Sequence, residues 1–142
     1  MAVGAVIARP MEIIKEKPFV YYILHWLYKV KWENIVIAWN GNLYCSESLP
    51  WHLIDHEAVH LRQQGGFFGS CWFFLRYICF KKFRYNKELE AYQNQYESFC
   101  SVVKDGNERY KFLVKIAFDL SSGMYGNVCG FEDAKKLIHS LD

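Results

Sequence analysis

Two histidines and a glutamate within one short segment constrain the fold of this 142-residue chain more than any other feature. Residues 56–60 have the sequence HEAVH. On an α-helix, residues four apart lie on one face, so the imidazoles of His56 and His60 can reach the same metal ion. Glu57 follows the first histidine and is placed to act as general base on a water beside that ion. The pattern therefore predicts a helical metal site, with Zn²⁺ as the expected ion.

The residues around this motif favour the helix that the site needs. Pro50 suits a first helical turn, where its missing N–H costs nothing. Gly65 and Gly66 form a stop signal, and no glycine or proline interrupts residues 51–64. We therefore predict a helix over residues 51–64.

His52 offers an alternative pair, because it lies four residues before His56. The residue after His52 is Leu53, which cannot act as a base, whereas Glu57 occupies that position in the pair of His56 and His60. We therefore prefer the latter pair as ligands. His52 is expected to support a ligand histidine or to pack against the helix.

The third ligand is expected on a second amphipathic helix that begins near residue 86. Glu88 lies at the edge of the apolar stripe of this helix, whereas Glu90 lies near 140° from the centre of the stripe by helical-wheel arithmetic, roughly opposite it. A ligand must point inward, so Glu88 is the preferred third ligand and Glu90 the alternative. Ala91 would let the helix approach the metal closely. The apolar stripe consists of Leu89, Tyr92, Tyr96, Phe99 and Val103.

The HExxH segment followed by E-x-E-A-Y at residues 88–92 resembles the gluzincin-type zinc metallopeptidases. The combination is similar to that of small HExxH/ExEAY metallopeptidases found in bacterial and phage genomes, over about residues 33–97. The resemblance implies a minimal zincin-like domain in which Glu88 completes a His-His-Glu zinc site, and a peptide or protein substrate. Tyr92 stands where many larger members carry Asp. The third histidine of the metzincin pattern is absent after His60.

Together these residues predict a zinc-dependent hydrolase, most simply a metalloendopeptidase. His56, His60 and Glu88 bind Zn²⁺ with water in the open fourth position, and Glu57 is the catalytic base. The alternative is a non-catalytic structural or interaction subunit of a larger assembly, such as a phage particle, that keeps a peptidase-like fold. A structural zinc site would need a fourth protein ligand, for which His52 is the reserve.

Length, charge and cysteine usage narrow the class of protein further. The chain, 1–142, has the length of a single domain, and its net charge of +2 gives no reason to expect nucleic-acid binding. Five cysteines without a CxxC argue against a disulfide scaffold, so synthesis in the reducing cytoplasm is expected, with incorporation into a phage particle as a further option. Residues 1–10 are apolar but lack a basic leader and are not predicted to be a signal peptide.

Two aromatic stretches, residues 19–28 and 67–80, raise the question of membrane contact, since aromatic residues make up 18% of the chain. Both are shorter than the ~20 residues that a spanning helix needs, so no transmembrane segment is predicted. Buried core helices are the first interpretation. The alternative is a membrane surface or a protein assembly partner bound through these residues, and the basic run at residues 81–84 would suit an interfacial helix.

The remaining pattern predicts an α+β fold that is mostly helical, with a β-hairpin before the HExxH helix. Asn40 and Gly41 give a strong type I′ turn signal between strands at residues 34–38 and 43–46. An exposed edge strand there could hold an extended peptide by backbone pairing, and a purely structural hairpin is the open alternative. The C-terminal third is expected to form helices over residues 110–120 and 131–141, separated by a loop.

Overall fold

The computed structural model describes residues 10–140, and the apolar N-terminal residues 1–9 lie outside this part. The expected α+β class, mostly helical with a hairpin before the HExxH helix, is confirmed. The helices are α1 (Phe19–Tyr28), α2 (Trp51–Gln64), α3 (Phe67–Cys79), α4 (Lys81–Val102), α5 (Gly106–Leu120) and α6 (Phe131–His139). The strands are β1 (Ile13–Ile14), β2 (Val36–Trp39) and β3 (Asn42–Cys45), and short 3₁₀ turns cover Trp32–Asn34 and Gly123–Tyr125.

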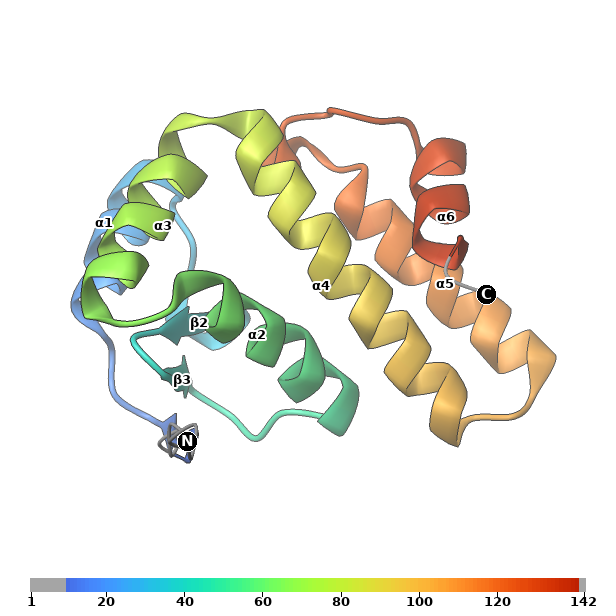
Figure 1. Cartoon of the computed structure of the whole chain (residues 1–142), viewed down its shortest axis with the longest axis horizontal. Coiled ribbons are helices and arrows are strands. Elements are labelled where there is room, and N and C mark those ends of the chain that lie inside the picture. The colour runs from blue at the N-terminus through green and yellow to red at the C-terminus, as the bar shows by residue number, and fades with distance from the viewer. Residues whose placement is uncertain (1–9, 141–142) are drawn as a thin grey trace, which may run out of the picture.

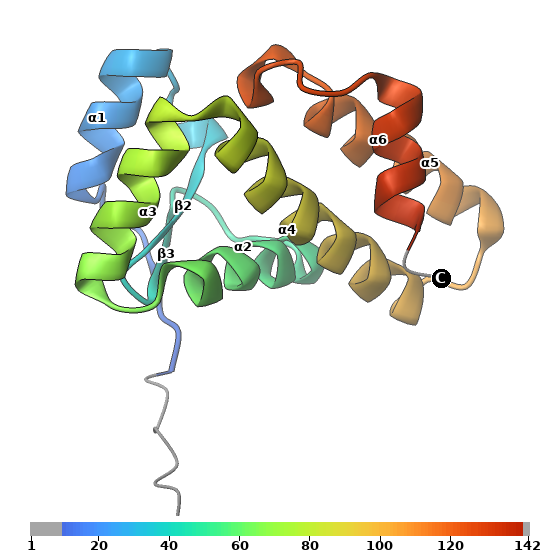
Figure 2. The same ribbon diagram turned by 45° about the horizontal axis from the view of Figure 1, so that its top comes forward.

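The long helix α4 runs through the middle of the molecule and separates two groups of elements (Figure 1). On one side lie α2 and the small sheet, with α1 and α3 side by side beyond them (Figure 2). On the other side lie α5 and α6, which pack on α4 around a core that includes Ile116, Leu120 and Ile138. Helix α2 packs against α4 more extensively than any other pair of elements within residues 10–140. The two predicted motif helices are therefore direct neighbours.

The predicted hairpin forms, and its turn has the predicted chemistry. Asn40 and Gly41 both have positive φ, of 46° and 86°, as a type I′ turn requires. The first strand begins later than predicted, at Val36, because Trp32–Asn34 forms a 3₁₀ turn instead. A short strand that the sequence did not indicate, β1, pairs in parallel with β3. The sheet order is therefore β1-β3-β2, which makes β2 an edge strand.

Buried hydrogen bonds of the Gln64 side chain connect this edge strand to α2 and α3. The Gln64 amide donates to the Ala38 carbonyl at 2.6 Å and accepts from the Ser70 hydroxyl at 2.9 Å. Gly69 lets the start of α3 lie close to the end of α2, because a Cβ at this position would lie 1.9 Å from the backbone carbonyl oxygen of Gln64. The strand, the end of α2 and the start of α3 thus meet with little room for adjustment.

The C-terminal helices follow the prediction with small shifts at their ends. Helix α5 begins at Gly106 rather than at residue 110, because the Asp105 carboxylate caps it by accepting from the Glu108 N–H at 2.9 Å. Helix α6 covers Phe131–His139, close to its predicted range. The five cysteines are all free thiols.

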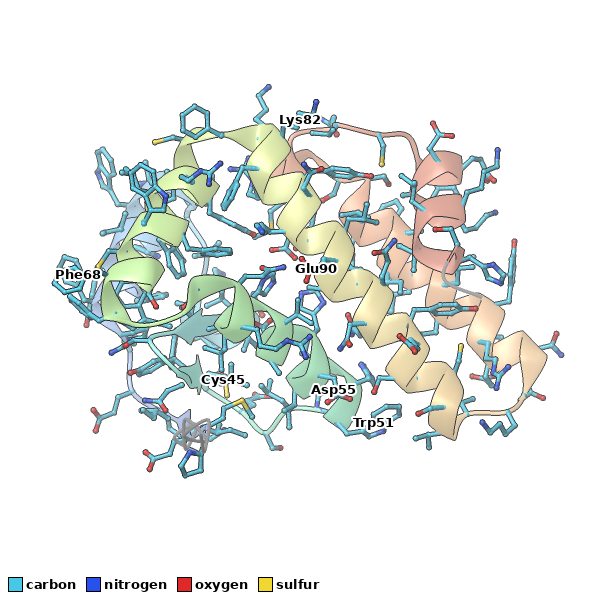
Figure 3. The ribbon with its side chains drawn as sticks, in the orientation of Figure 1. Cys45, Trp51, Asp55, Phe68, Lys82 and Glu90 are labelled. Atoms are coloured by element: carbon cyan, nitrogen blue, oxygen red, sulfur yellow. The ribbon has the colours of Figure 1, made fainter. Side chains whose placement is uncertain are left out.

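The interpretation of the two aromatic stretches as plain core helices is wrong for one face of each. Phe73 is buried, but its neighbour Trp72 is 62% exposed, and Phe68 is 85% exposed and projects outward from α3 (Figure 3). On α1, Leu24 is buried while Trp26 lies in solvent. Both helices are apolar around most of their circumference, so the sequence carried little contrast between the faces. Within residues 10–140, no helix is long and apolar enough to cross a membrane.

Adjacent substitutions on α3 test this division of faces. Phe73→Ala removes a buried ring and should lower the free energy of unfolding by about 3 kcal/mol or more. Trp72→Ala removes an exposed ring and should change it by less than ~0.5 kcal/mol. Urea denaturation of both variants measures the difference. Equal losses at the two positions would contradict the arrangement of α3.

Candidate metal centre

Helices α2 and α4 bring His56, His60 and Glu88 together in the interior. All three side chains are buried, and their ligand atoms lie within 4.8 Å of one another. The Nε2 of His56 is 3.3 Å from one Glu88 carboxylate oxygen, and the Nε2 of His60 is 3.4 Å from the other. Ala91, which has no exposed surface, lies on α4 one turn after Glu88, where a small side chain permits close helix packing. The structure thus brings together the three residues that the sequence selected as ligands.

These two distances exceed those of charge-assisted hydrogen bonds and are close to the separation of two ligand atoms on one zinc ion. With Zn–N and Zn–O bonds of ~2.0–2.1 Å, two ligand atoms of a tetrahedron lie ~3.3 Å apart. A charge-assisted N–H···O bond would bring the same atoms to ~2.7–2.9 Å. The His56–Glu88 and His60–Glu88 separations are 3.3 and 3.4 Å. The spacing of the donors therefore suits a cation between them.

The hydrogen bonds behind the histidines orient both rings for metal binding. His60 Nδ1 is 3.0 Å from the side-chain amide oxygen of Gln63, and His56 Nδ1 is 2.9 Å from the side-chain amide oxygen of Gln95. Because an amide oxygen only accepts, each Nδ1 carries a proton, and in the neutral imidazole each Nε2 presents a lone pair. Glu88 Oε2 is buried and has no hydrogen-bond donor within the described part of the chain. Two lone pairs facing a carboxylate repel it unless a cation or a proton lies between them.

The two glutamines are themselves held in place, which explains the roles of His52 and Glu90. The Gln95 amide is 3.0 Å from His52 Nδ1, so His52 lies behind a ligand histidine and outside the group of ligand atoms. The Gln63 amide donates to Glu90 at 2.9 Å, and Figure 3 shows Glu90 projecting from α4. Glu90, the alternative ligand, therefore supports the orientation of His60 indirectly.

Tyr77 and Tyr92 complete the surroundings of the site. The Tyr77 hydroxyl donates to Glu88 at 2.5 Å, and burial raises the pKa of Tyr77 well above its usual value, so it remains a donor. The Tyr92 ring meets the His56 ring edge-on at 4.6 Å, as expected for a packing residue. Sequence reasoning missed Tyr77 and Gln95, and it placed Gln63 on the helix face of His56 and His60 without assigning it a role. For Tyr77 the only available signal was a polar atom within an otherwise apolar stretch.

The electrostatics of the site follow from burial and from the close approach of its charges. Burial raises the pKa of Glu57 above its usual value. Burial alone would also raise the pKa of Glu88, but the two histidines hold it well below its usual range. Burial alone would lower the pKa of His60, but the Glu88 carboxylate raises it to about 9. In the metal-free protein near neutral pH, a proton on His60 therefore takes the place of a metal cation.

A cavity gives access to these groups. Its volume is about 120 Å³, whereas one water needs only ~10–15 Å³. Glu57, His56, His60 and Glu88 line it on the α2–α4 side, and Ile35 and residues 36–38 of the edge strand line it on another. The predicted base, the candidate metal ligands and the edge strand therefore face one space.

No protein-family model, no curated protein and no solved structure matches the chain.

The proton on His60 predicts how zinc affinity depends on pH. Because the metal must displace that proton, affinity should rise up to about tenfold per pH unit between pH 6.5 and 9 and level off above. Binding at pH 7 should release about one proton, measured by calorimetry in two buffers that differ in ionisation enthalpy. Zinc binding that releases no proton and has the same affinity at pH 6.5 and pH 9 would contradict His60 as a ligand.

Proposed function

We propose that the chain is a zinc-dependent hydrolase that cleaves peptide bonds, a metalloendopeptidase of the gluzincin type. One observation carries the proposal: three buried donor groups have ligand atoms within 4.8 Å of one another and line a cavity that Glu57 also lines. Only three donors form the group within residues 10–140. Three protein ligands with an open fourth position are typical of catalytic zinc, whereas structural zinc is closed by four.

The residues present fit the ion. His56 and His60 would bind it through Nε2 and Glu88 through its carboxylate, which relieves the unsatisfied Glu88 Oε2. Zinc would supply Lewis-acid activation of a water and of the scissile carbonyl. Tyr77 donates a hydrogen bond to the Glu88 carboxylate, as the outer partners of ligands commonly do.

Glu57 is the residue proposed to move the proton. It follows His56 on α2, is buried, and lines the same cavity. Its raised pKa improves it as a base toward a water in that cavity. Glu57 takes the proton of the attacking water and transfers it to the leaving amine nitrogen.

The edge strand β2 supports a peptide as substrate. The Ala38 carbonyl accepts from the Gln64 side chain, so it points away from β3. In an antiparallel pair, alternate residues direct their backbone groups to the same edge, so Val36 also faces outward. An extended peptide could pair with the backbone of Val36 beside the metal site, because this residue lines the cavity.

A second candidate function rests on a different observation, the exposed aromatic faces of α1 and α3. Trp26, Phe68 and Trp72 are large apolar side chains in solvent, as at surfaces that bind other proteins. In this alternative the chain is an interaction subunit of a larger assembly, such as a phage particle. The two functions differ in whether a purified, zinc-loaded protein cleaves peptides.

Three glutamate-to-glutamine variants separate the roles of the base and the ligand. Glu57→Gln should keep zinc and lose nearly all peptide cleavage, because the amide cannot accept the proton. Glu88→Gln should lose zinc affinity by at least about tenfold, and activity with it. Glu90→Gln is the matched control and should change little, because the new amide can still accept from Gln63. Zinc content and cleavage of a peptide library measure all three.

Two outcomes would contradict the proposal. Zinc loss in Glu90→Gln but not in Glu88→Gln would reassign the third ligand. Zinc retention in all three variants, with no peptide cleaved by the parent protein, would favour the interaction subunit.

A further inference from the structure

Arg84 is a buried cation without an anionic partner. Its side chain lies on α4 and is 7% exposed. None of the ion pairs within residues 10–140 includes it, and its Nε is buried with no hydrogen-bond acceptor. Arginine is almost never buried without such a partner, because removal of its charge from water is unfavourable.

The hydrogen bonds that Arg84 makes hold its guanidinium group through one nitrogen only. All of its hydrogen bonds come from Nη1, which donates to the Tyr77 carbonyl at 2.8 Å, the Tyr28 hydroxyl at 3.3 Å and the Ile78 carbonyl at 3.5 Å. The rings of Tyr28 and Tyr77 lie 5.9 and 5.7 Å from the guanidinium carbon. These neutral groups position the cation at the C-terminal end of α3. Nη2 makes none of these hydrogen bonds, and a guanidinium nitrogen without an acceptor is a strong donor to a carboxylate oxygen.

Arg84 lines the same cavity as the metal ligands and the base. The nearest carboxylate along the helix, Glu88, is directed to His56, His60 and Tyr77 instead. If a divalent cation is bound, Glu57 and Glu88 match its two charges. The charge of Arg84 then has no counterpart among the residues that line the cavity.

We propose that Arg84 binds a carboxylate group of the peptide substrate, within one or two residues of the cleaved bond. This proposal rests on the proposed peptidase function. Arg84 lies one turn before Glu88, a separation of ~6 Å along the helix. An extended peptide covers ~3.3–3.6 Å per residue, so this separation corresponds to one or two residues of the substrate. The carboxylate comes either from the C-terminus of the substrate or from an aspartate or glutamate side chain.

Four matched peptides distinguish the two sources. They share one sequence and combine a free or amidated C-terminus with glutamate or glutamine next to the cleaved bond. The parent protein should show a kcat/KM at least about tenfold higher for a carboxylate in one of the two places. Arg84→Gln should bring the ratio of kcat/KM between the carboxylate and neutral peptides to about one. It should leave the kcat/KM for the neutral peptide within about twofold of the parent value. Arg84→Lys, which keeps the charge but not the planar fork, should give an intermediate ratio.

A control variant and a binding measurement guard against effects on folding or on zinc. Arg76→Gln removes an exposed arginine of α3 that stacks on Phe83, and it should preserve the ratio. Calorimetry with the zinc-loaded Glu57→Gln protein, which binds without turnover, should give at least about tenfold tighter binding of the preferred peptide than of its neutral counterpart. Adding Arg84→Gln, or Arg84→Lys if that protein does not fold, should reduce this selectivity.

The outcomes separate this proposal from the proposed hydrolase. Peptide cleavage without a carboxylate preference, or with equal losses for all four peptides in Arg84→Gln, overturns the role of Arg84 and leaves the hydrolase standing. If the parent cleaves no peptide, the hydrolase fails and the binding measurement decides. If carboxylate peptides bind more tightly than neutral ones and Arg84→Gln removes the difference, a carboxylate site at Arg84 is supported. If the peptides bind equally tightly, the site is overturned.

Discussion

The buried carboxylate of Glu88 is the constraint on which the rest of the site depends. A carboxylate at 4% exposure must be matched by positive charge and hydrogen bonds, or the fold would be strongly destabilised. Helix α2 supplies the partners, two imidazoles whose Nδ1 atoms are fixed by Gln63 and Gln95. The close packing of α2 on α4 is therefore both the centre of the fold and the arrangement that makes a cation favourable there.

The same packing connects the metal centre to the proposed substrate-binding edge. Gln64, at the end of α2, holds both the Ala38 carbonyl of β2 and the Ser70 hydroxyl of α3. The strand, the candidate ligands and Tyr77 thus surround one cavity, and the proposed catalysis would require these groups to be held in place. Arg84 adds a fixed positive charge to the wall of that cavity.

The sequence predicted the parts that depend on local patterns, and missed those that depend on long-range contacts. The helical phase distinguished Glu88 from Glu90, and the Asn40–Gly41 signal located the hairpin turn. The contact of Gln95 with His56 joins residues 39 apart, which no periodicity indicates. The exposed face of α3, with Trp72, was misassigned because aromatic residues occur on both of its faces, so their pattern could not show which face is buried.

The central claim is that a metal ion lies between His56, His60 and Glu88. Anomalous diffraction at the zinc absorption edge, on crystals grown with zinc, tests it most directly. The account predicts one strong peak ~2.0–2.2 Å from both Nε2 atoms and from a Glu88 oxygen. Zinc-grown crystals with no peak there, and with Glu88 still 3.3 and 3.4 Å from the two histidines, would contradict it.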